Sequence, residues 1–296
     1  MAQTERSPAL DQIVDLVTYP IDQRGSDRYS MVVAAAMAGL RSQGCAVIKD
    51  LIRPEAIARM NNEIAARKHT THFSTDSINP YFHTSVDPQY PDHHPVNTFI
   101  ERSSGFIPGD SWDETCSIDA LFRSPELGAF LADCLELPEL HCYADPLAGL
   151  TANILDPGQQ FTWHFDTNEF AVTILVQEAA VGGEFEYYPA IRSPTDEGFD
   201  TIAALLASAD AANQIEGVHS LDLRPGDLQI FRGRYSLHRV KRVAADSVPR
   251  HAAIFAFTEQ PDVIGRVERT QQLFGRVLPE HTAAELVRVR SDTLID

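Results

Sequence analysis

The chain has 296 residues, of which 44% are hydrophobic, and it carries a formal net charge of −18 with a pI near 4.9. Phosphate groups are bound by clustered Lys and Arg, so this acidic chain is not expected to bind nucleic acid or an anionic membrane surface. Its charge is compatible with a cationic or zwitterionic small substrate. We find no long apolar run and no apolar segment at the N-terminus, and therefore expect no membrane association and a cytoplasmic location.

The four cysteines are spread along the chain and form no CxxC pair. This low count and spacing predict reduced thiols that pack in the protein interior.

The first part of the chain, residues 1–140, is predicted to be mainly helical with loops. Apolar spacing and stop signals such as Gly44 place helices at 29–43, 53–69 and about 117–136, and a short strand at 45–52. Residues 70–115 are rich in His, Pro, Ser, Thr and Asp, and we expect long loops there, folded over a site.

From residue 141 the chain changes to short runs rich in β-branched and aromatic residues, which predict strands. These runs lie at 150–156, 161–166, 170–178, 181–189, 219–223, 228–233, 235–243 and 250–259. A loop and one helix at 193–218 interrupt them, and a further helix is expected near 279–290. The order predicts an α+β fold whose strands close into a barrel or sandwich. We expect a single domain over 1–296, with the β core at 141–260 and a helical tail at 261–296.

The run "FTWHFDTNEF" places His164 and Asp166 two positions apart, so in a strand both point to one face while Trp163 and Phe165 point to the other. One nitrogen and one oxygen ligand suit a divalent transition metal, and His238 in "YSLHRVKRV" supplies a third ligand from another strand. Two histidines and one carboxylate form the facial triad of non-haem Fe(II) oxygenases. Alone, an HxD pair occurs by chance, and His238 alone is equally typical of a core histidine bonded to a backbone carbonyl.

Taken together, these motifs resemble the Fe(II)/2-oxoglutarate-dependent dioxygenases, whose catalytic part is a double-stranded β-helix, or jelly roll. "HFD" resembles the family's ligand pair, "LRPGDLQIFRG" the turn and strand before the distal histidine, and "LHRV" that histidine. The resemblance covers most of the chain and implies an enzyme that uses Fe(II), 2-oxoglutarate and dioxygen. Within the family, the motifs are most similar to enzymes that act on small molecules, often amino acids.

The resemblance also implies a basic residue shortly after the distal histidine that binds the distal carboxylate of 2-oxoglutarate. Arg250, twelve positions after His238, opens the last strand and is the first choice, and Arg242 is the competitor. Asn153 and Thr151 occupy a strand position that contacts the cosubstrate in this family. Each of these residues also has a plainer interpretation, as a surface arginine or as a hydrogen-bonding group of the barrel interior.

Four further polar residues near the ligands are predicted to contact substrate: Asn168, Glu169, Arg232 and Arg234. A site that carries both charge signs suits a zwitterion, because buried charges need partners. Solvent-exposed loop positions are the alternative for the last three.

We therefore expect hydroxylation of an sp³ carbon of a small polar substrate, a free amino acid or a derivative, with release of succinate and CO₂. Halogenases of this fold replace the carboxylate ligand by Gly or Ala, so Asp166 favours hydroxylation. Desaturation and cyclisation remain alternatives, as does a cupin-type metal-binding isomerase or binding protein that does not use 2-oxoglutarate. The sequence is compatible with a homodimer and does not identify the substrate.

Overall fold

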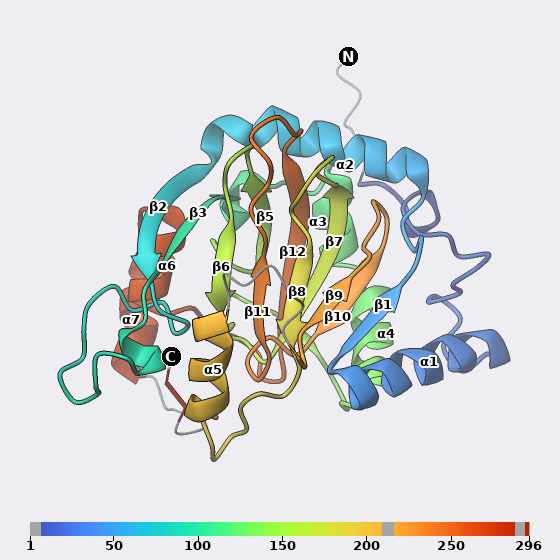
Figure 1. Ribbon diagram of the computed structural model, residues 1–296. Helices are drawn as coiled ribbons and strands as arrows, with labels where there is room; N and C mark the ends of the chain where they lie inside the picture. The colour runs from blue at the N-terminus through green and yellow to red at the C-terminus, as the bar shows by residue number, and fades with distance from the viewer. Residues whose placement is uncertain (1–6, 209–215, 288–293, 296) are drawn as a thin grey trace.

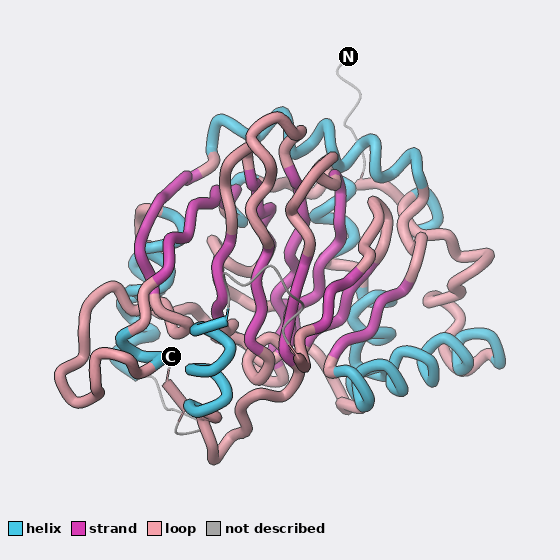
Figure 2. The backbone as a smooth tube through the Cα atoms, in the orientation of Figure 1, coloured by secondary structure: helices cyan, strands magenta, loops and turns pink. Residues whose placement is uncertain are grey.

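Two antiparallel β-sheets face each other in the computed structural model, which describes residues 7–208, 216–287 and 294–295 (Figure 1). Helices from the first half of the chain cover the outer face of the larger sheet, and the N- and C-terminal halves both supply strands to it. Figure 2 shows the strands gathered in the centre with the helices outside them. The predicted α+β fold with a jelly-roll core is confirmed.

The larger sheet has eight strands. Its order is β1 (Cys45–Ile48), β10 (Leu228–Phe231), β7 (Phe170–Gln177), β12 (Arg250–Thr258), β5 (Leu150–Leu155), β3 (Ile100–Ile107) and β2 (His72–Ile78), and the short β4 (His141–Cys142) also pairs with β12.

The smaller sheet forms the opposite wall of the barrel. Its order is β6 (Phe161–His164), β11 (Leu237–Val240), β8 (Phe185–Tyr188) and β9 (His219–Leu221). The two sheets enclose the side chains that point inward from both walls, and the predicted metal ligands are among them.

Four helices pack against the outer face of the larger sheet: α1 (Asp27–Gln43), α2 (Pro54–Arg67), α3 (Ser117–Phe122) and α4 (Pro125–Leu135). Helix α1 ends where Gly44 takes a φ of 67°, a backbone conformation that glycine adopts without strain, as the sequence predicted. Helix α5 (Phe199–Ser208) lies in the predicted insertion, and α6 (Val267–Phe274) and α7 (Pro279–Val287) follow the last strand. Short 3₁₀ helices occupy Leu10–Gln12, Lys68–Thr70, Pro95–Asn97 and Gly109–Ser111.

Alternation along the strands separates the helix-facing core from the barrel interior. On β5, Ala152 and Ile154 belong to the apolar cluster beneath the helices, whereas Thr151 and Asn153 point the other way. The helices thus cover one face of the sheet and leave its polar face inside the barrel, where the site lies.

The expectation of long loops over 70–115 is wrong for two segments. Strands β2 and β3 pair at seven positions and extend the larger sheet, and β3 continues onto β5. Residues of β2 alternate between exposed and half-buried, but its period-two pattern is carried by Ser, Thr and Asp rather than by strongly apolar residues. Helix α6 lies within the predicted helical tail at 261–296, although a helix was specified only near 279–290.

Other expectations hold where the structure describes the chain. The four cysteines are unpaired, three of them buried and Cys142 partly so. Residues 209–215 of the predicted insertion and the end of the predicted 279–290 helix lie outside the described residues. Among the described helices, none has both the length and the apolar character needed to cross a membrane. That 1–296 is a single domain stays a prediction.

Candidate active site

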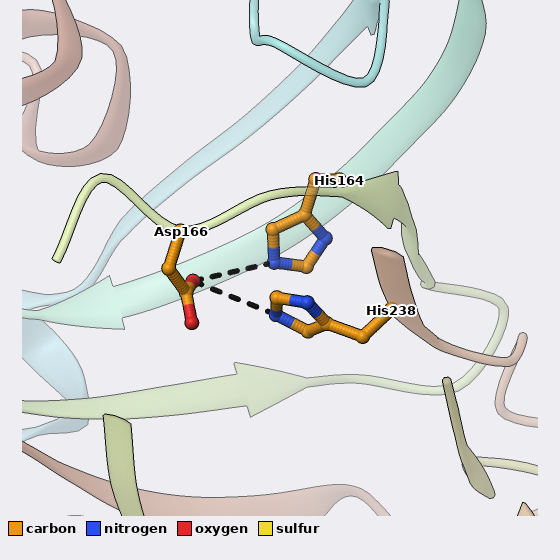
Figure 3. Close-up of side chains that lie close together, drawn as sticks. All are labelled: His164, Asp166 and His238. Atoms are coloured by element: carbon orange, nitrogen blue, oxygen red, sulfur yellow. Dashed lines mark ion pairs between the residues drawn. The ribbon is translucent and has the colours of Figure 1, made fainter. Parts of the chain in front are cut away.

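The three predicted ligands meet at one point between the sheets. His164 on β6 and His238 on β11 are direct partners across the antiparallel pair, which places their imidazole rings 4.0 Å apart between centroids. Oδ1 of Asp166 lies 3.8 Å from Nε2 of His164 and 3.5 Å from Nε2 of His238 (Figure 3). One ligand atom from each residue falls within 4.8 Å of the others. Two imidazole nitrogens and one carboxylate oxygen on one side of a common point fit a non-haem Fe(II) centre.

Backbone carbonyls fix the orientation and protonation of both imidazoles. Nδ1 of His164 donates to the Thr162 carbonyl at 2.7 Å, and Nδ1 of His238 donates to the Ser236 carbonyl at 2.9 Å. A carbonyl only accepts, so Nδ1 carries the proton and Nε2 keeps a lone pair directed at the common point. This is the tautomer that a metal ligand requires.

The charge state of the site also suits a cation. Burial lowers the pKa of His164 well below its usual value, and the neighbouring His238 lowers it further. For Asp166, burial opposes ionisation, but the adjacent imidazoles of His238 and His164 hold the pKa at about 2. At neutral pH the site therefore presents an ionised carboxylate beside a neutral His164.

The carboxylate of Asp166 is seated against Gly233. The Asp166 N–H donates to the Gly233 carbonyl at 3.1 Å, and a Cβ at position 233 would lie 1.8 Å from Oδ2 of Asp166. A glycine at 233 is thus needed for the carboxylate to reach the two histidines. The sequence places Gly233 only at the end of the predicted strand 228–233, so this requirement was not predicted.

We expect Gly233→Ala to displace the Asp166 carboxylate and to weaken iron binding by about 10–100-fold, the range seen when support of a metal ligand is lost. Gly128→Ala is the matched control, because a Cβ there meets nothing within 4 Å. Iron content after dialysis measures the effect. Equal iron content in Gly233→Ala and the wild-type enzyme would contradict this role.

An interior cavity of about 560 Å³ extends from the triad to Arg250 at the start of β12. Arg250 is 6% exposed, and none of the described residues forms a hydrogen bond or an ion pair with its guanidinium. Burial lowers the pKa of Arg250 to about 10 without an acidic group to oppose it. An unpaired buried guanidinium is costly, and a carboxylate bound in a bidentate pair would compensate for that cost.

Of the other predicted cosubstrate residues, Asn153 lines this cavity, and its Nδ2 donates to the Gly105 carbonyl at 3.2 Å. Gln229 and Thr173, which the sequence did not single out, line it too and bond to each other at 2.9 Å. The competitor Arg242 is half exposed and pairs with Glu101 at 3.1 Å on the protein surface. Arg242 is therefore engaged outside the cavity.

On the other side of Asp166 lies a second cavity. Its volume, including the open mouth, is about 800 Å³. Thr151 and Asn168 line this second cavity, so Thr151 lies apart from the predicted cosubstrate group. Most of the wall is aromatic or aliphatic. Helix α6 and the turn that contains Phe82 close it.

The remaining predicted substrate residues do not line either cavity. Glu169 shares a hydrogen bond with Glu259, and its pKa is raised first by burial and then by that neighbouring acid. Arg234 is 8% exposed and donates to the Thr167 carbonyl at 2.9 Å. Arg232 lies over the ring of Phe170 at 5.7 Å. These groups support the segment that follows Asp166, and the structure brings only Asn168 of the four to the second cavity.

Sequence reasoning missed Phe82. It has a φ of 69°, a region that bulky residues rarely adopt, and its ring meets the ring of His164 edge-on at 5.5 Å. The Asn79-Pro80 pair is a turn signal that marks this segment, but the contact with His164 spans about 80 residues of sequence.

The comparisons with known proteins agree with this fold. A family model described as Halogenase D matches residues 111–274. Among solved structures, the chain is similar to a 2OG-Fe(II) oxygenase family oxidoreductase from Burkholderia pseudomallei, with 14% identity, a TM-score of 0.50, and coverage of 80% of this chain and 93% of that one. It is also similar to AviO1 from Streptomyces viridochromogenes Tue57, with 17% identity, a TM-score of 0.51, and coverage of 78% and 96%. The α-ketoglutarate-dependent epimerase SnoN from nogalamycin biosynthesis matches with 12% identity, a TM-score of 0.51, and coverage of 77% and 83%. No curated protein matches the sequence.

Proposed function

The chain belongs to the Halogenase D family and is an Fe(II)/2-oxoglutarate-dependent oxygenase, and from this premise we propose that it hydroxylates an sp³ carbon of a small polar substrate, a free amino acid or a derivative. Fe(II) and 2-oxoglutarate are its cofactors. The observation that carries the proposal is the carboxylate of Asp166, which stands beside the two histidine Nε2 atoms and across the cavity from the unpaired Arg250.

In the overall reaction, a substrate C–H bond, dioxygen and 2-oxoglutarate yield a C–OH bond, succinate and CO₂. The bound iron and 2-oxoglutarate supply the oxidant that attacks the C–H bond. His164, Asp166 and His238 hold the metal from one side, which leaves the opposite side open to cosubstrate, dioxygen and substrate.

Arg250 receives the distal carboxylate of 2-oxoglutarate at the far end of the interior cavity. Its planar fork matches a carboxylate, and Asn153 and Gln229 line the space between Arg250 and the metal. The cavity between Arg250 and the three ligands would thus hold the cosubstrate with its distal carboxylate at Arg250 and its other end beside His164, Asp166 and His238.

Substrate occupies the second cavity, beyond Asp166. Asn168 and Thr151 offer hydrogen bonds there, and the aromatic walls exclude water from the reacting carbon. Arg234 donates to the Thr167 carbonyl and Arg232 lies over the Phe170 ring, so both act on substrate through the 167–170 segment, which carries Asn168 and Glu169.

Halogenation is the second candidate function, and the description of the matched family favours it. A halide must occupy a coordination position on the metal. In this chain the carboxylate of Asp166 takes a ligand position, and Gly233 leaves the space for it. These two residues favour transfer of a hydroxyl group over transfer of a halide.

A cupin-type isomerase or binding protein is disfavoured by Arg250. Without 2-oxoglutarate, this buried cation would have no partner among the described residues. Anaerobic addition of Fe(II) and 2-oxoglutarate separates the two cases, because only the oxygenase gives the weak violet charge-transfer band of the chelate.

The test of the function is a product screen. The enzyme, Fe(II) and 2-oxoglutarate are incubated in chloride-containing buffer with a mixed amino-acid pool, and the products are examined by mass spectrometry. We expect a compound that gains one oxygen, in a one-to-one ratio with succinate. A gain of chlorine would replace the proposal by halogenation, and a loss of two hydrogens would replace it by desaturation or ring closure. Turnover only with a peptide, lipid or polyketide would reject the substrate class.

A further inference from the structure

The guanidinium of Arg250 has no hydrogen bond among the described residues that would fix its position. Its place in the cavity therefore depends on the backbone from which the side chain starts and on the atoms packed against its stem. Gly183, with a φ of 74°, approaches that stem closely, since a Cβ at position 183 would lie 3.2 Å from Cδ of Arg250. A glycine leaves room for the stem but offers it no polar side chain. The groups that hold the start of β12 must then set where the guanidinium stands.

Strand pairing is irregular next to Arg250. His251 lies opposite Gln177 of β7. The next pair is Ala252 with Leu175, so one residue of β7 has no counterpart on β12. An irregularity of this kind interrupts the regular ladder and changes the direction in which neighbouring side chains point. The backbone that carries Arg250 thus needs support from groups other than the ladder.

The side chain of Gln177 supplies that support. Its Nε2 donates to the carbonyl of Pro249, the residue immediately before Arg250, at 2.7 Å. Its Oε1 accepts from Nδ2 of Asn61 on α2 at 3.0 Å. Because both ends of the amide are bonded, Gln177 connects the start of β12 to a helix on the outer face of the sheet.

His251 completes this set of bonds on the helix side of β12. Its Nδ1 donates to Oδ1 of Asn61 at 3.0 Å, and an amide oxygen only accepts, so Nδ1 carries the proton. Burial and the charges of Lys68 and Arg250 lower the pKa of His251 to about 4, so the ring is neutral at neutral pH. The residues on both sides of Arg250 are therefore held through the same asparagine.

This polar set is kept at a cost in stability. Nε2 of His251 is buried and has no hydrogen-bond partner among the described residues. A buried polar atom without a partner lowers stability, and apolar side chains at positions 61, 177 and 251 could pack α2 on the sheet without that cost. A role in positioning Arg250 accounts for the polar residues, because binding groups must be held within a fraction of an ångström.

We propose that Gln177 is a positioning residue for Arg250. With Asn61 and His251 it holds the start of β12, so that the guanidinium stands at the distance from the metal ligands that 2-oxoglutarate requires. Gln177 does not line the interior cavity, so it acts on the cosubstrate through Arg250. The inference rests on the proposed function, because it concerns the arginine assigned to the distal carboxylate of 2-oxoglutarate.

Two 2-oxo acids separate this role from damage to the metal site. Both 2-oxoglutarate and 2-oxobutyrate can chelate Fe(II), but 2-oxobutyrate lacks the distal carboxylate. Their affinities are measured anaerobically by titrating the charge-transfer band of the Fe(II)-loaded enzyme. We expect Gln177→Met to weaken 2-oxoglutarate binding at least about fivefold and to leave 2-oxobutyrate binding unchanged within about twofold. Asn61→Ala should cause a smaller loss in the same direction.

Each variant has a matched control. In the wild type, Nε2 of Gln160 also donates to a backbone carbonyl, that of Glu101 at 2.8 Å, and Gln160 does not line the cavity. Gln160→Met therefore breaks a bond of the same kind elsewhere. Asn62→Ala is the control for Asn61→Ala, because Asn62 is the next residue of α2 and is exposed. Both controls should bind the two acids as the wild type does.

A double-mutant cycle tests whether Gln177 acts through Arg250. In the Arg250→Ala background, Gln177→Met should cause no further loss of 2-oxoglutarate affinity, because no guanidinium is left to position. Circular dichroism checks that each variant is folded. If Gln177→Met does not fold, Asn61→Ala and Asn62→Ala are compared in both backgrounds, with the same expectation.

Three results overturn the proposal: wild-type affinity for 2-oxoglutarate in Gln177→Met, an equal loss for both 2-oxo acids, or a loss of the same size in the Arg250→Ala background. Wild-type affinity in Asn61→Ala would remove Asn61 and His251 from the role. Failure of the proposed function looks different, because the charge-transfer band with Fe(II) and 2-oxoglutarate would then be absent from the wild-type enzyme itself.

Discussion

Replacing either His164 or His238 with alanine is expected to abolish both iron retention and turnover. Each histidine offers one Nε2 lone pair to the common point, because its Nδ1 already donates to a backbone carbonyl. Each ring therefore supplies one metal ligand that the remaining ring cannot replace. Loss of a supporting contact alone weakens metal binding by about 10–100-fold, and loss of a ligand should cost at least about 100-fold. Iron content after gel filtration and succinate release with substrate measure the two effects.

His219→Ala is the control for this experiment. His219 lies on β9 in the same sheet, where its ring faces Tyr187 at 5.3 Å between centroids and does not belong to the metal-binding cluster. It should keep full iron content and activity, and circular dichroism should show that all three variants are folded. Full iron occupancy in His164→Ala or His238→Ala would remove these residues from the metal site.

The metal triad was accessible from sequence because its geometry is local. The spacing of His164 and Asp166 predicted a common face from the period of a strand, and His238 stands in a run that has strand composition. In the structure β6 ends at His164, and Asp166 follows it in a segment whose N–H bonds to the Gly233 carbonyl. The structure adds the reason that the three meet, since His164 and His238 are register partners. Arg250 was found through family resemblance, and its burial without a partner is a structural fact that no sequence pattern contains.

The second cavity was not accessible from sequence because it is made by distant segments. Phe82, Asp166 and Arg269 are separated by about 80–190 residues of sequence, and none of the three has a pattern that points to the others. Glu169, Arg232 and Arg234 are close to the ligands in sequence, and the structure places them outside the lining of the two cavities. Glu169 bonds to Glu259, and Arg234 donates to the Thr167 carbonyl. Their contact with substrate stays a prediction.

The strands at 72–78 and 100–107 could also not be predicted from the sequence. Their residues are mostly small and polar, so pairing of the two strands with each other, and of β3 with β5, places them in the sheet where composition gives little signal. The role of Gly233 is a single-residue example of a feature that the sequence does not reveal. In sequence it is the last residue of a predicted strand, and only the position of Asp166 reveals that any side chain at 233 would occupy the space of a metal ligand.

Arg250→Ala is expected to raise the KM for 2-oxoglutarate by at least about tenfold, since a hydrogen bond to a charged group contributes about 1.5–3 kcal/mol. The value of kcat at saturating 2-oxoglutarate should change much less, because Arg250 binds the end of the cosubstrate that does not react. Arg242→Ala is the control, since Arg242 pairs with Glu101 outside the cavity. If Arg242→Ala raises this KM and Arg250→Ala does not, the cosubstrate arginine is Arg242.

Thermal unfolding gives an independent measurement of the same contact. Burial lowers the pKa of Arg250 to about 10, so at neutral pH the folded protein holds a charge that the unfolded chain solvates better. Removing that charge should leave the Tm of the cosubstrate-free enzyme unchanged or slightly raised. Adding 2-oxoglutarate stabilises the wild type by mass action, by about 2.7 kcal/mol at 100 times the Kd. At the same concentration Arg250→Ala should gain at least about 1.4 kcal/mol less for a tenfold weaker Kd. An equal gain in Tm for the two proteins would show that Arg250 does not hold the cosubstrate.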